Sequence, residues 1–399
     1  MPFDRLRVED LPLRGKRVLV RVDYNVPLGA DGSVADDRRI VASLPTVRRV
    51  LDAPAVAILC SHLGRPKGRD PKASLAGVAR RLSDLLGRPV AFVPDCVGPD
   101  VEAAVAKAAP GDCLLLENLR YHAGEEKNDP AFAASLARLA DLYVDDAFGA
   151  AHRAHASVAA VAGLLPSAAG YLLAKEVETL GGLLEDPRRP FVVIAGGAKT
   201  SDKVPILRSL LPKMNSLLVG GGMAYTFLRA QGVPTGASRV EESAVQAARE
   251  ILRDADVHEV KVLLPSDHVC AAALEAGVAT RVVRGSVPDG MMGLDIGPET
   301  VGEFCGAIAK AGTVLWNGPV GAFETPPFDA GSAAVARALA GSKAVTVVGG
   351  GDTAAAVEAA GLAARMTHVS TGGGAALELL EGRVLPGVAA LARREGTAR

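Results

Sequence analysis

The chain has 399 residues, of which 49% are hydrophobic and 22% charged. This length suggests two domains, with three as the alternative, of about 100–200 residues each. Basic and acidic side chains number 44 and 45, so no basic excess points to a nucleic-acid or membrane-surface protein. The five cysteines are far apart and form no Cys-x-x-Cys pair, which argues against a zinc ribbon or a disulfide framework.

The N-terminal segment is charged and lacks the apolar core of a signal peptide. No apolar run approaches the roughly 20 residues that a membrane span needs. We therefore expect a soluble, cytoplasmic protein in a reducing compartment, with Cys60 and Cys113 as buried thiols.

A short apolar run followed by a helix-like segment recurs along the chain. Helix-like segments at 74–86, 131–140 and 243–254 separate apolar runs of strand length. Uninterrupted apolar runs are typical of strands buried on both faces, and their alternation with helices indicates βαβ units. Two doubly wound parallel-sheet (Rossmann-like) α/β domains fit this pattern better than one. The expected strands are 17–21, 55–61, 113–117, 142–146, 191–195, 216–220, 261–265, 313–317, 344–349 and 367–370.

A domain boundary is expected near the middle of the chain. Residues 168–184 have a helical pattern, and the polar segment EDPRRP at 185–190 ends it. We expect an N-terminal domain over residues 1–170, a connector helix and linker over 171–190, and a C-terminal domain over 191–379.

Ligands of open parallel sheets bind beyond the carboxyl ends of the strands, so the residues that follow each run carry the functional information. In the first half, each of these segments contains an arginine: RVDYN (21–25), SHLGRP (61–66), ENLR (117–120) and DDAFGAAHRAH (145–155). Converging guanidinium groups would bind carboxylate or phosphate. The alternative is that these arginines are scattered surface cations.

The second half instead has glycine-rich segments after its strands: GGAKTSDK (196–203), GGGM (220–223), WNGP (316–319), GGGDT (349–353) and STGGG (370–374). Glycine lets backbone amides approach a ligand, and a helix N-terminus attracts phosphate. Lysines beside one loop and an aspartate in another suit a nucleotide with Mg²⁺. The alternative is a set of tight turns that need glycine only for their geometry.

Two common nucleotide motifs are absent from the sequence. No G-x-x-x-x-G-K-[ST] occurs, and no G-x-G-x-x-G follows the first strand of either half, which weakens a dinucleotide-binding interpretation. His152 and His155 are too isolated for a metal site. His62 is better interpreted as an anion ligand than as a general base.

Longer motifs resemble the phosphoglycerate kinase family in unbroken order along almost the whole chain. They are RVDYNVP (21–27), SHLGRP (61–66), ENLRYHAGEEKND (117–129), DDAFGAAHRAHAS (145–157), GGAKTSDK (196–203), GGGMAYTFL (220–228), MGLDIGP (292–298), WNGPVGAFE (316–324), GGGDTAAA (349–356) and HVSTGGGAALELLEG (368–382). The resemblance implies two domains that close about a hinge, a monomer, and a C-terminal segment, residues 380–399, that returns to the first domain.

The resemblance also implies roles for the matching residues. Arg39, Lys199 and Gly351 would be catalytic, and Asp352 would bind Mg²⁺. Phosphoglycerate would be bound by Asp23, Tyr24, Asn25, Arg39, His62, Leu63, Gly64, Arg65, Arg120 and Arg153. ATP or ADP would be bound by Lys199, Lys203, Gly293, Glu324, Gly350, Gly351, Asp352 and Thr353. Arg39, and not its neighbour Arg38, matches because the family's arginine directly precedes an isoleucine.

The chain departs from the family pattern at a few positions, namely Asp145, Ala150 and Thr200, where asparagine, threonine and valine are common. None of these changes removes a charged group from the motifs. The implied reaction is phosphoryl transfer between 1,3-bisphosphoglycerate and ADP. Two other hypotheses are weighed against it: an NAD-dependent dehydrogenase and a non-catalytic nucleotide- or sugar-phosphate-binding protein.

Overall fold

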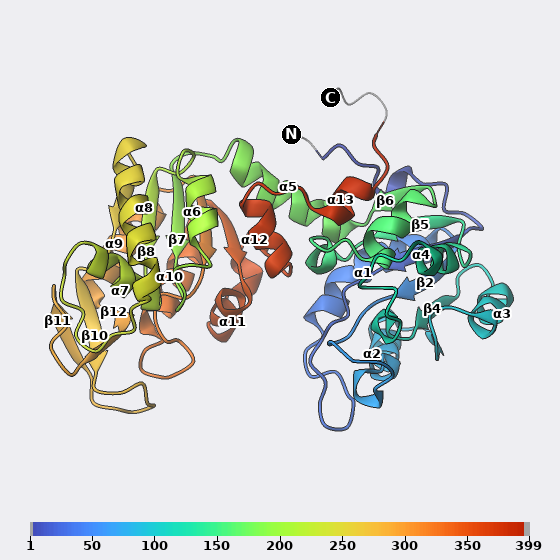
Figure 1. The fold of residues 1–399 in the computed structure, drawn as a ribbon, viewed down its shortest axis with the longest axis horizontal. Coiled ribbons are helices and arrows are strands. Elements are labelled where there is room, and N and C mark those ends of the chain that lie inside the picture. Colours follow the sequence, from blue (N-terminus) through green and yellow to red (C-terminus); the bar gives the residue numbers. More distant parts are fainter. Residues whose placement is uncertain (1–2, 395–399) are drawn as a thin grey trace. The chain divides into compact units, whose positions relative to one another are not determined.

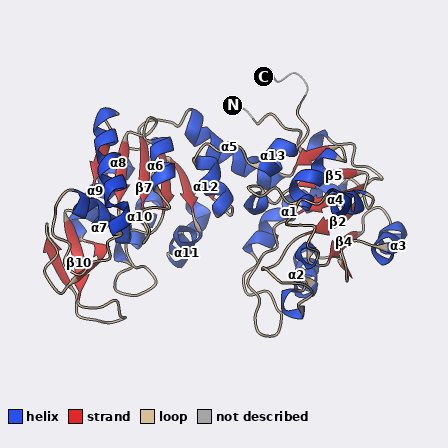
Figure 2. Ribbon diagram, viewed as in Figure 1, coloured by secondary structure: helices blue, strands red, loops and turns tan. Residues whose placement is uncertain are grey.

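The computed structural model describes residues 3–394, which form two compact units (Figure 1). The first unit comprises the residues up to Glu178 together with those from Val384 onward, and the second comprises Thr179–Arg383. The division falls within one helix, α5 (Tyr171–Glu185). Strands and helices alternate through both units (Figure 2).

A six-stranded parallel sheet forms the centre of the first unit, in the order β3-β4-β2-β1-β5-β6. Its helices pack through apolar faces: in α1, buried Ile40, Leu44 and Val47 recur at helical spacing. The strands are β1 (Arg17–Arg21), β2 (Val56–Cys60), β3 (Ala91–Val93), β4 (Cys113–Leu116), β5 (Leu142–Asp145) and β6 (Ser167–Ala169). Besides the first part of α5, the α-helices of this unit are α1 (Arg38–Asp52), α2 (Ala76–Leu86), α3 (Pro99–Lys107), α4 (Pro130–Ala137) and α13 (Pro386–Ala390).

A second six-stranded parallel sheet forms the centre of the second unit, in the order β15-β14-β13-β7-β8-β9. Its core surrounds the fully buried Trp316 on the central strand β13. The strands are β7 (Phe191–Ala195), β8 (Ser216–Val219), β9 (Lys261–Leu263), β13 (Thr313–Asn317), β14 (Val345–Gly349) and β15 (His368–Val369). The helices are α6 (Val204–Leu210), α7 (Gly221–Ala230), α8 (Val245–Val257), α9 (Pro298–Ala309), α10 (Ala330–Gly341), α11 (Gly351–Ala359) and α12 (Gly374–Leu380).

The predicted fold class is confirmed, and all ten expected strands are present with ends within two residues of the prediction. The sequence did not predict the short strands β3 and β6, and residues 168–169 belong to β6 rather than to the start of a helix. It also missed a three-stranded antiparallel sheet made of β10 (Asp267–Ala271), β11 (Arg281–Arg284) and β12 (Met292–Ile296).

The C-terminal segment pairs with the N-terminal segment within the first unit. The Leu6 amide donates to the Ala392 carbonyl at 2.9 Å, and the Arg394 amide donates to the Asp4 carbonyl at 2.9 Å. The chain therefore passes from the first unit to the second and back again. Within residues 3–394, no helix has the length and apolar character needed to cross a membrane.

Candidate active site

Charged and polar groups of the first unit meet at the carboxyl edge of its sheet. Arg39, at the start of α1, donates through Nη1 to Asp23 Oδ2 at 3.0 Å and to the Asn25 carbonyl at 3.2 Å. Asn25 Oδ1 accepts from the Gly64 amide at 2.8 Å, and the Gly64 carbonyl accepts from Arg120 Nη1 at 2.5 Å. One continuous set of hydrogen bonds thus connects the loops after β1, β2 and β4.

Beneath these loops lies a buried layer of hydrogen bonds. Arg21 is fully buried, and its guanidinium donates to Ser157 Oγ at 2.8 Å and to His62 Nδ1 at 3.1 Å. Ser157 Oγ in turn donates to the buried carboxylate of Glu125 at 2.6 Å. Ser157 lies on a π-helical turn, Ala156–Ala160. The buried arginine is therefore linked through one hydroxyl to a buried carboxylate.

Two histidines of this region are held in the neutral state. Burial, and then the charges of Arg21 and Arg120, lower the pKa of His62 well below its usual value. Burial and the same two arginines lower the pKa of His155 to about 4, so its 3.7 Å approach to Glu125 is not an ion pair at neutral pH. Because Arg21 donates to His62 Nδ1, the imidazole proton of His62 resides on Nε2, which can donate to an anion.

The other predicted phosphoglycerate residues occupy different environments. Tyr24 is fully buried and its hydroxyl bonds to Ser43 Oγ at 2.9 Å, so its side chain faces the core. Leu63 is also buried, and its backbone is clamped by Asn118 through bonds of 3.2 and 2.8 Å. Arg65 is exposed, and Arg153 is half-buried with its Nε 3.1 Å from His152 Nε2.

The glycine loops of the second unit pack closely on one another. The Gly197 amide donates to the Pro319 carbonyl at 2.8 Å, and the Gly221 amide donates to the Val320 carbonyl at 2.8 Å. A Cβ on Gly221, whose φ is +63°, would lie 2.7 Å from the Pro319 carbonyl oxygen. The tight-turn explanation therefore accounts for glycine at this position, which needs no ligand to explain it.

The loop that opens α11 has unfilled hydrogen-bonding capacity around it. Lys203 is half-buried and donates through Nζ to Asn317 Oδ1. Asn317 Nδ2 is buried without a partner among the described residues, and it would lie 3.1 Å from a Cβ on Gly349. A Cβ on Gly351 would meet no atom within 4 Å. An ammonium, an unpaired amide and a helix N-terminus thus border open space, as an anion site requires.

The remaining predicted nucleotide residues lie on neighbouring segments of the second unit. The Gly293 amide donates to Ser238 Oγ at 2.9 Å. The carbonyl of Leu294 accepts from the Ala322 amide at 2.8 Å, two residues before the exposed Glu324. Thr353 Oγ accepts from the Gly318 amide at 2.7 Å. Lys199 is exposed. The loops around 197, 221, 319 and 350 directly follow β7, β8, β13 and β14. They therefore lie together at the carboxyl edge of the sheet.

Asp352 has the chemistry that Mg²⁺ prefers. Its carboxylate is exposed in the first turn of α11, and no hydrogen bond or ion pair engages it among residues 3–394. Burial lowers the pKa of Lys203, while the negative charges of Asp202 and Asp352 oppose that shift. An oxygen ligand free of other partners, beside a site that suits phosphate, fits a magnesium ion held partly by nucleotide.

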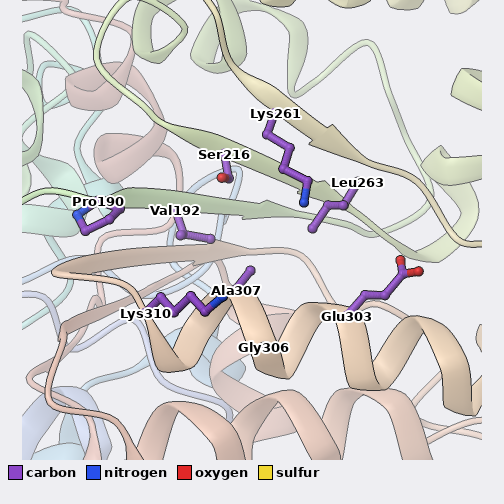
Figure 3. A pocket seen from close by; sticks show the side chains of 9 residues that line it. All are labelled: Pro190, Val192, Ser216, Lys261, Leu263, Glu303, Gly306, Ala307 and Lys310. Atoms are coloured by element: carbon purple, nitrogen blue, oxygen red, sulfur yellow. The ribbon is translucent and has the colours of Figure 1, made fainter.

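A hollow elsewhere on the second unit is not part of this site. It encloses about 470 Å³ between α9 and the amino ends of β7, β8 and β9 (Figure 3). Lys261 and Lys310 extend into it, and Gly306 and Ala307 leave it open (Figure 3). None of the predicted site residues lines it, and the glycine loops lie at the opposite edge of the sheet.

The whole chain is similar to proteins of one family. The model of that family, described as phosphoglycerate kinase, matches residues 8–383. The chain belongs to the phosphoglycerate kinase family. It is 57% identical to the phosphoglycerate kinase of Moorella thermoacetica over 98% of this chain and 100% of that protein. It is 55% identical to the phosphoglycerate kinase of Anaeromyxobacter dehalogenans over 96% of this chain and 98% of that protein.

Solved structures of phosphoglycerate kinases have the same fold. The enzyme from Coxiella burnetii superposes with a TM-score of 0.89 at 40% identity, over 97% of this chain and 98% of that one. The enzyme from Pyrococcus horikoshii superposes with a TM-score of 0.85 at 30% identity, over 97% of this chain and 98% of that one. This chain is therefore a kinase, a phosphotransferase, and the dehydrogenase hypothesis has no support.

Sequence reasoning missed several groups that support the site. Glu125 and Ser157 lie in motifs that the sequence singled out, yet neither was assigned a role. Asn317 was seen only as part of a glycine-rich turn. Their polar side chains follow or flank predicted strands, but their burial, which gives them their importance, is not visible in a sequence.

Proposed function

We propose that this chain transfers the acyl phosphate of 1,3-bisphosphoglycerate to ADP, reversibly, giving 3-phosphoglycerate and ATP. The observation that supports this most is a division of chemistry between the units. One has arginines and neutral histidines at its strand ends, and the other has a lysine, an unpaired amide and an open helix N-terminus at its own. The first set suits a small anionic acid and the second suits nucleotide phosphates.

The reaction explains why these residues need no general base. In the direction that forms the acyl phosphate, the nucleophile is a carboxylate with a pKa near 4, which is already ionised at neutral pH. Positioning and neutralisation of charge are then the enzyme's main tasks. In this proposal Arg39 turns from Asp23 toward the transferring phosphoryl group, and Lys199 and the Gly351 amide approach it from the nucleotide side. His62 donates its Nε2 proton in a hydrogen bond to the acid.

The nucleotide side is proposed to bind ATP or ADP with Mg²⁺. Asp352 would hold the ion, and the bound ion would neutralise charge on the nucleotide phosphates. Lys203 and Asn317 Nδ2 would bind phosphate oxygens directly, while the α11 amides would do so through the helix N-terminus.

The two sets of residues belong to different units, so direct in-line transfer requires them to meet. We propose that closure occurs about the segment 171–190 and excludes water. Small-angle X-ray scattering with both substrates should then show a smaller radius of gyration than without them. An unchanged radius would count against closure. Monomeric state, cytoplasmic location and a place in glycolysis are further parts of this proposal.

A coupled assay of ATP with 3-phosphoglycerate tests the activity, and the chain offers its own matched control. Arg39→Ala should lower kcat by about 10²–10³-fold, since a donor to the transferring group is lost. Arg38→Ala should leave kcat within about twofold, because Arg38 is exposed and its Nε bonds the two carboxylate oxygens of Asp36 at 2.8 and 2.9 Å. No turnover by the unmodified chain, or equal effects of the two substitutions, would contradict the assignment.

A further inference from the structure

A second cluster of ligand-type side chains lies outside the site described above. Asp95 and Cys96 lie one residue beyond β3, after Pro94, and His122 directly follows the 3-10 turn Leu119–Tyr121. One possible ligand atom from each of the three residues lies within 4.8 Å of the other two. Ligands of a tetrahedral zinc ion lie about 3–4 Å apart, so small side-chain rotations would bring the three into range.

We propose that Asp95, Cys96 and His122 form a binding site for a zinc-type divalent transition metal. A thiolate, an imidazole and a carboxylate are the donors that such ions select, whereas Mg²⁺ and Ca²⁺ prefer oxygen alone. The site has three protein ligands, and solvent supplies the fourth. On binding, the Cys96 thiol releases its proton to solvent and its sulfur forms a bond to the metal.

The surrounding contacts orient the ligands. The His122 ring stacks on Phe132, with ring centroids 5.3 Å apart and planes inclined by 24°. His122 Nε2 already approaches Asp95 Oδ1 at 2.7 Å, so a proton now occupies the place that a metal would take. Asp95 and His122 side chains are each 31% exposed, which leaves a path for an ion, while Cys96 is fully buried beneath them.

The positively charged side chain of Arg69 lies next to the cluster and opposes the binding of a cation there. Arg69 pairs with the other carboxylate oxygen, Asp95 Oδ2, and its Nη1 donates to the Pro94 carbonyl at 3.1 Å. This guanidinium can remain on Oδ2 while Oδ1 binds the metal, as outer hydrogen-bond partners of metal ligands commonly do. Its positive charge nevertheless weakens binding of a cation, so its removal should tighten the site.

Titration of the full-length protein with Co²⁺ alone, which substitutes for Zn²⁺ and absorbs light, tests the site without turnover. Wild type should show a thiolate-to-cobalt charge-transfer band that saturates at one equivalent. Cys96→Ser should remove the band, and His122→Asn should weaken the Kd by at least about tenfold. Arg69→Gln should tighten it several-fold. Cys305→Ser, which alters the half-buried thiol of the second unit, should change nothing.

Three outcomes would overturn the proposal. They are absence of the band in wild type, a band that survives Cys96→Ser, and a Kd that is the same in His122→Asn and wild type. Circular dichroism of each variant shows whether it is folded. If Cys96→Ser does not fold, the His122→Asn and Arg69→Gln pair decides alone, because both positions are partly exposed and their predicted effects have opposite signs.

Discussion

Ser157 offers a direct test of the buried layer beneath the proposed phosphoglycerate site. Its hydroxyl accepts from Arg21 Nε at 2.8 Å and donates to Glu125 at 2.6 Å, and all three side chains are buried. A hydrogen bond to a charged group contributes about 1.5–3 kcal/mol. Ser157→Ala removes two of them and little volume, so the free energy of unfolding of the first unit should fall by about 3–6 kcal/mol.

Ser43 provides a control of similar size and burial in the same unit. Its hydroxyl bonds Tyr24 Oη and the Ile40 carbonyl, each at 2.9 Å, and both partners are uncharged. Two neutral hydrogen bonds contribute about 1 kcal/mol each, so Ser43→Ala should cost about 1–2 kcal/mol. The difference between the two losses in free energy of unfolding therefore measures the contribution of the charged partners of Ser157.

Urea unfolding followed by circular dichroism reports both units, whereas the fluorescence of Trp316, the one tryptophan of the chain, reports the second unit. Ser157→Ala should shift the transition of the first unit and leave the tryptophan transition in place. The KM for 3-phosphoglycerate should rise as well, because Arg21 also holds His62. Equal destabilisation by Ser157→Ala and Ser43→Ala would refute the role given to the charged pair.

Two further predictions concern the titration of a buried carboxyl group and the proposed nucleotide loop. Burial raises the pKa of Asp146 from 3.8 to about 8, so the folded state keeps a proton that the unfolded state loses, and stability falls as pH rises from about 4 to 8. Asp146→Asn should reduce the drop in thermal midpoint between pH 5 and pH 8. Asp141→Asn, at a carboxylate whose pKa is lowered by its hydrogen bond from Arg17, should not. Gly351→Ala should leave the thermal midpoint unchanged, because a Cβ at this position meets no atom within 4 Å. It should nevertheless raise the KM for the nucleotide at least about tenfold, because the added methyl group fills the space proposed for phosphate. An unchanged KM would mean that phosphate does not approach this loop.

The sequence predicted the parallel sheets because their strands are buried on both faces. β2 and β7 are uninterrupted apolar runs, and the structure buries every residue of both. The antiparallel sheet escaped prediction because polar residues interrupt its strands: Asp267 and His268 open β10, and Asp295 lies within β12. In β11, Val282 is 52% exposed while its neighbour Val283 is 8% exposed, and arginines stand at both ends. A search for continuous apolar runs does not find such a strand.

The candidate site was predictable at the level of loops but not of the layer beneath them. Glu125 and Glu126 are adjacent and chemically identical in the sequence, yet the first is fully buried against Ser157 and the second is largely exposed beside Arg120. The direction of each side chain depends on tertiary packing of the π-helical turn, which no local pattern reports. The same holds for Asn317, whose unpaired amide becomes visible only when Lys203 is placed beside it.

The pairing of the two chain ends has a consequence for biosynthesis. The segment that hydrogen-bonds to Asp4 and Leu6 is made only after the roughly 200 residues of the second unit. At a translation rate of about 5–20 residues per second, the first unit waits about 10–40 seconds for its last segment. The part of the enzyme that emerges first from the ribosome is therefore completed last, after the second unit has had time to fold.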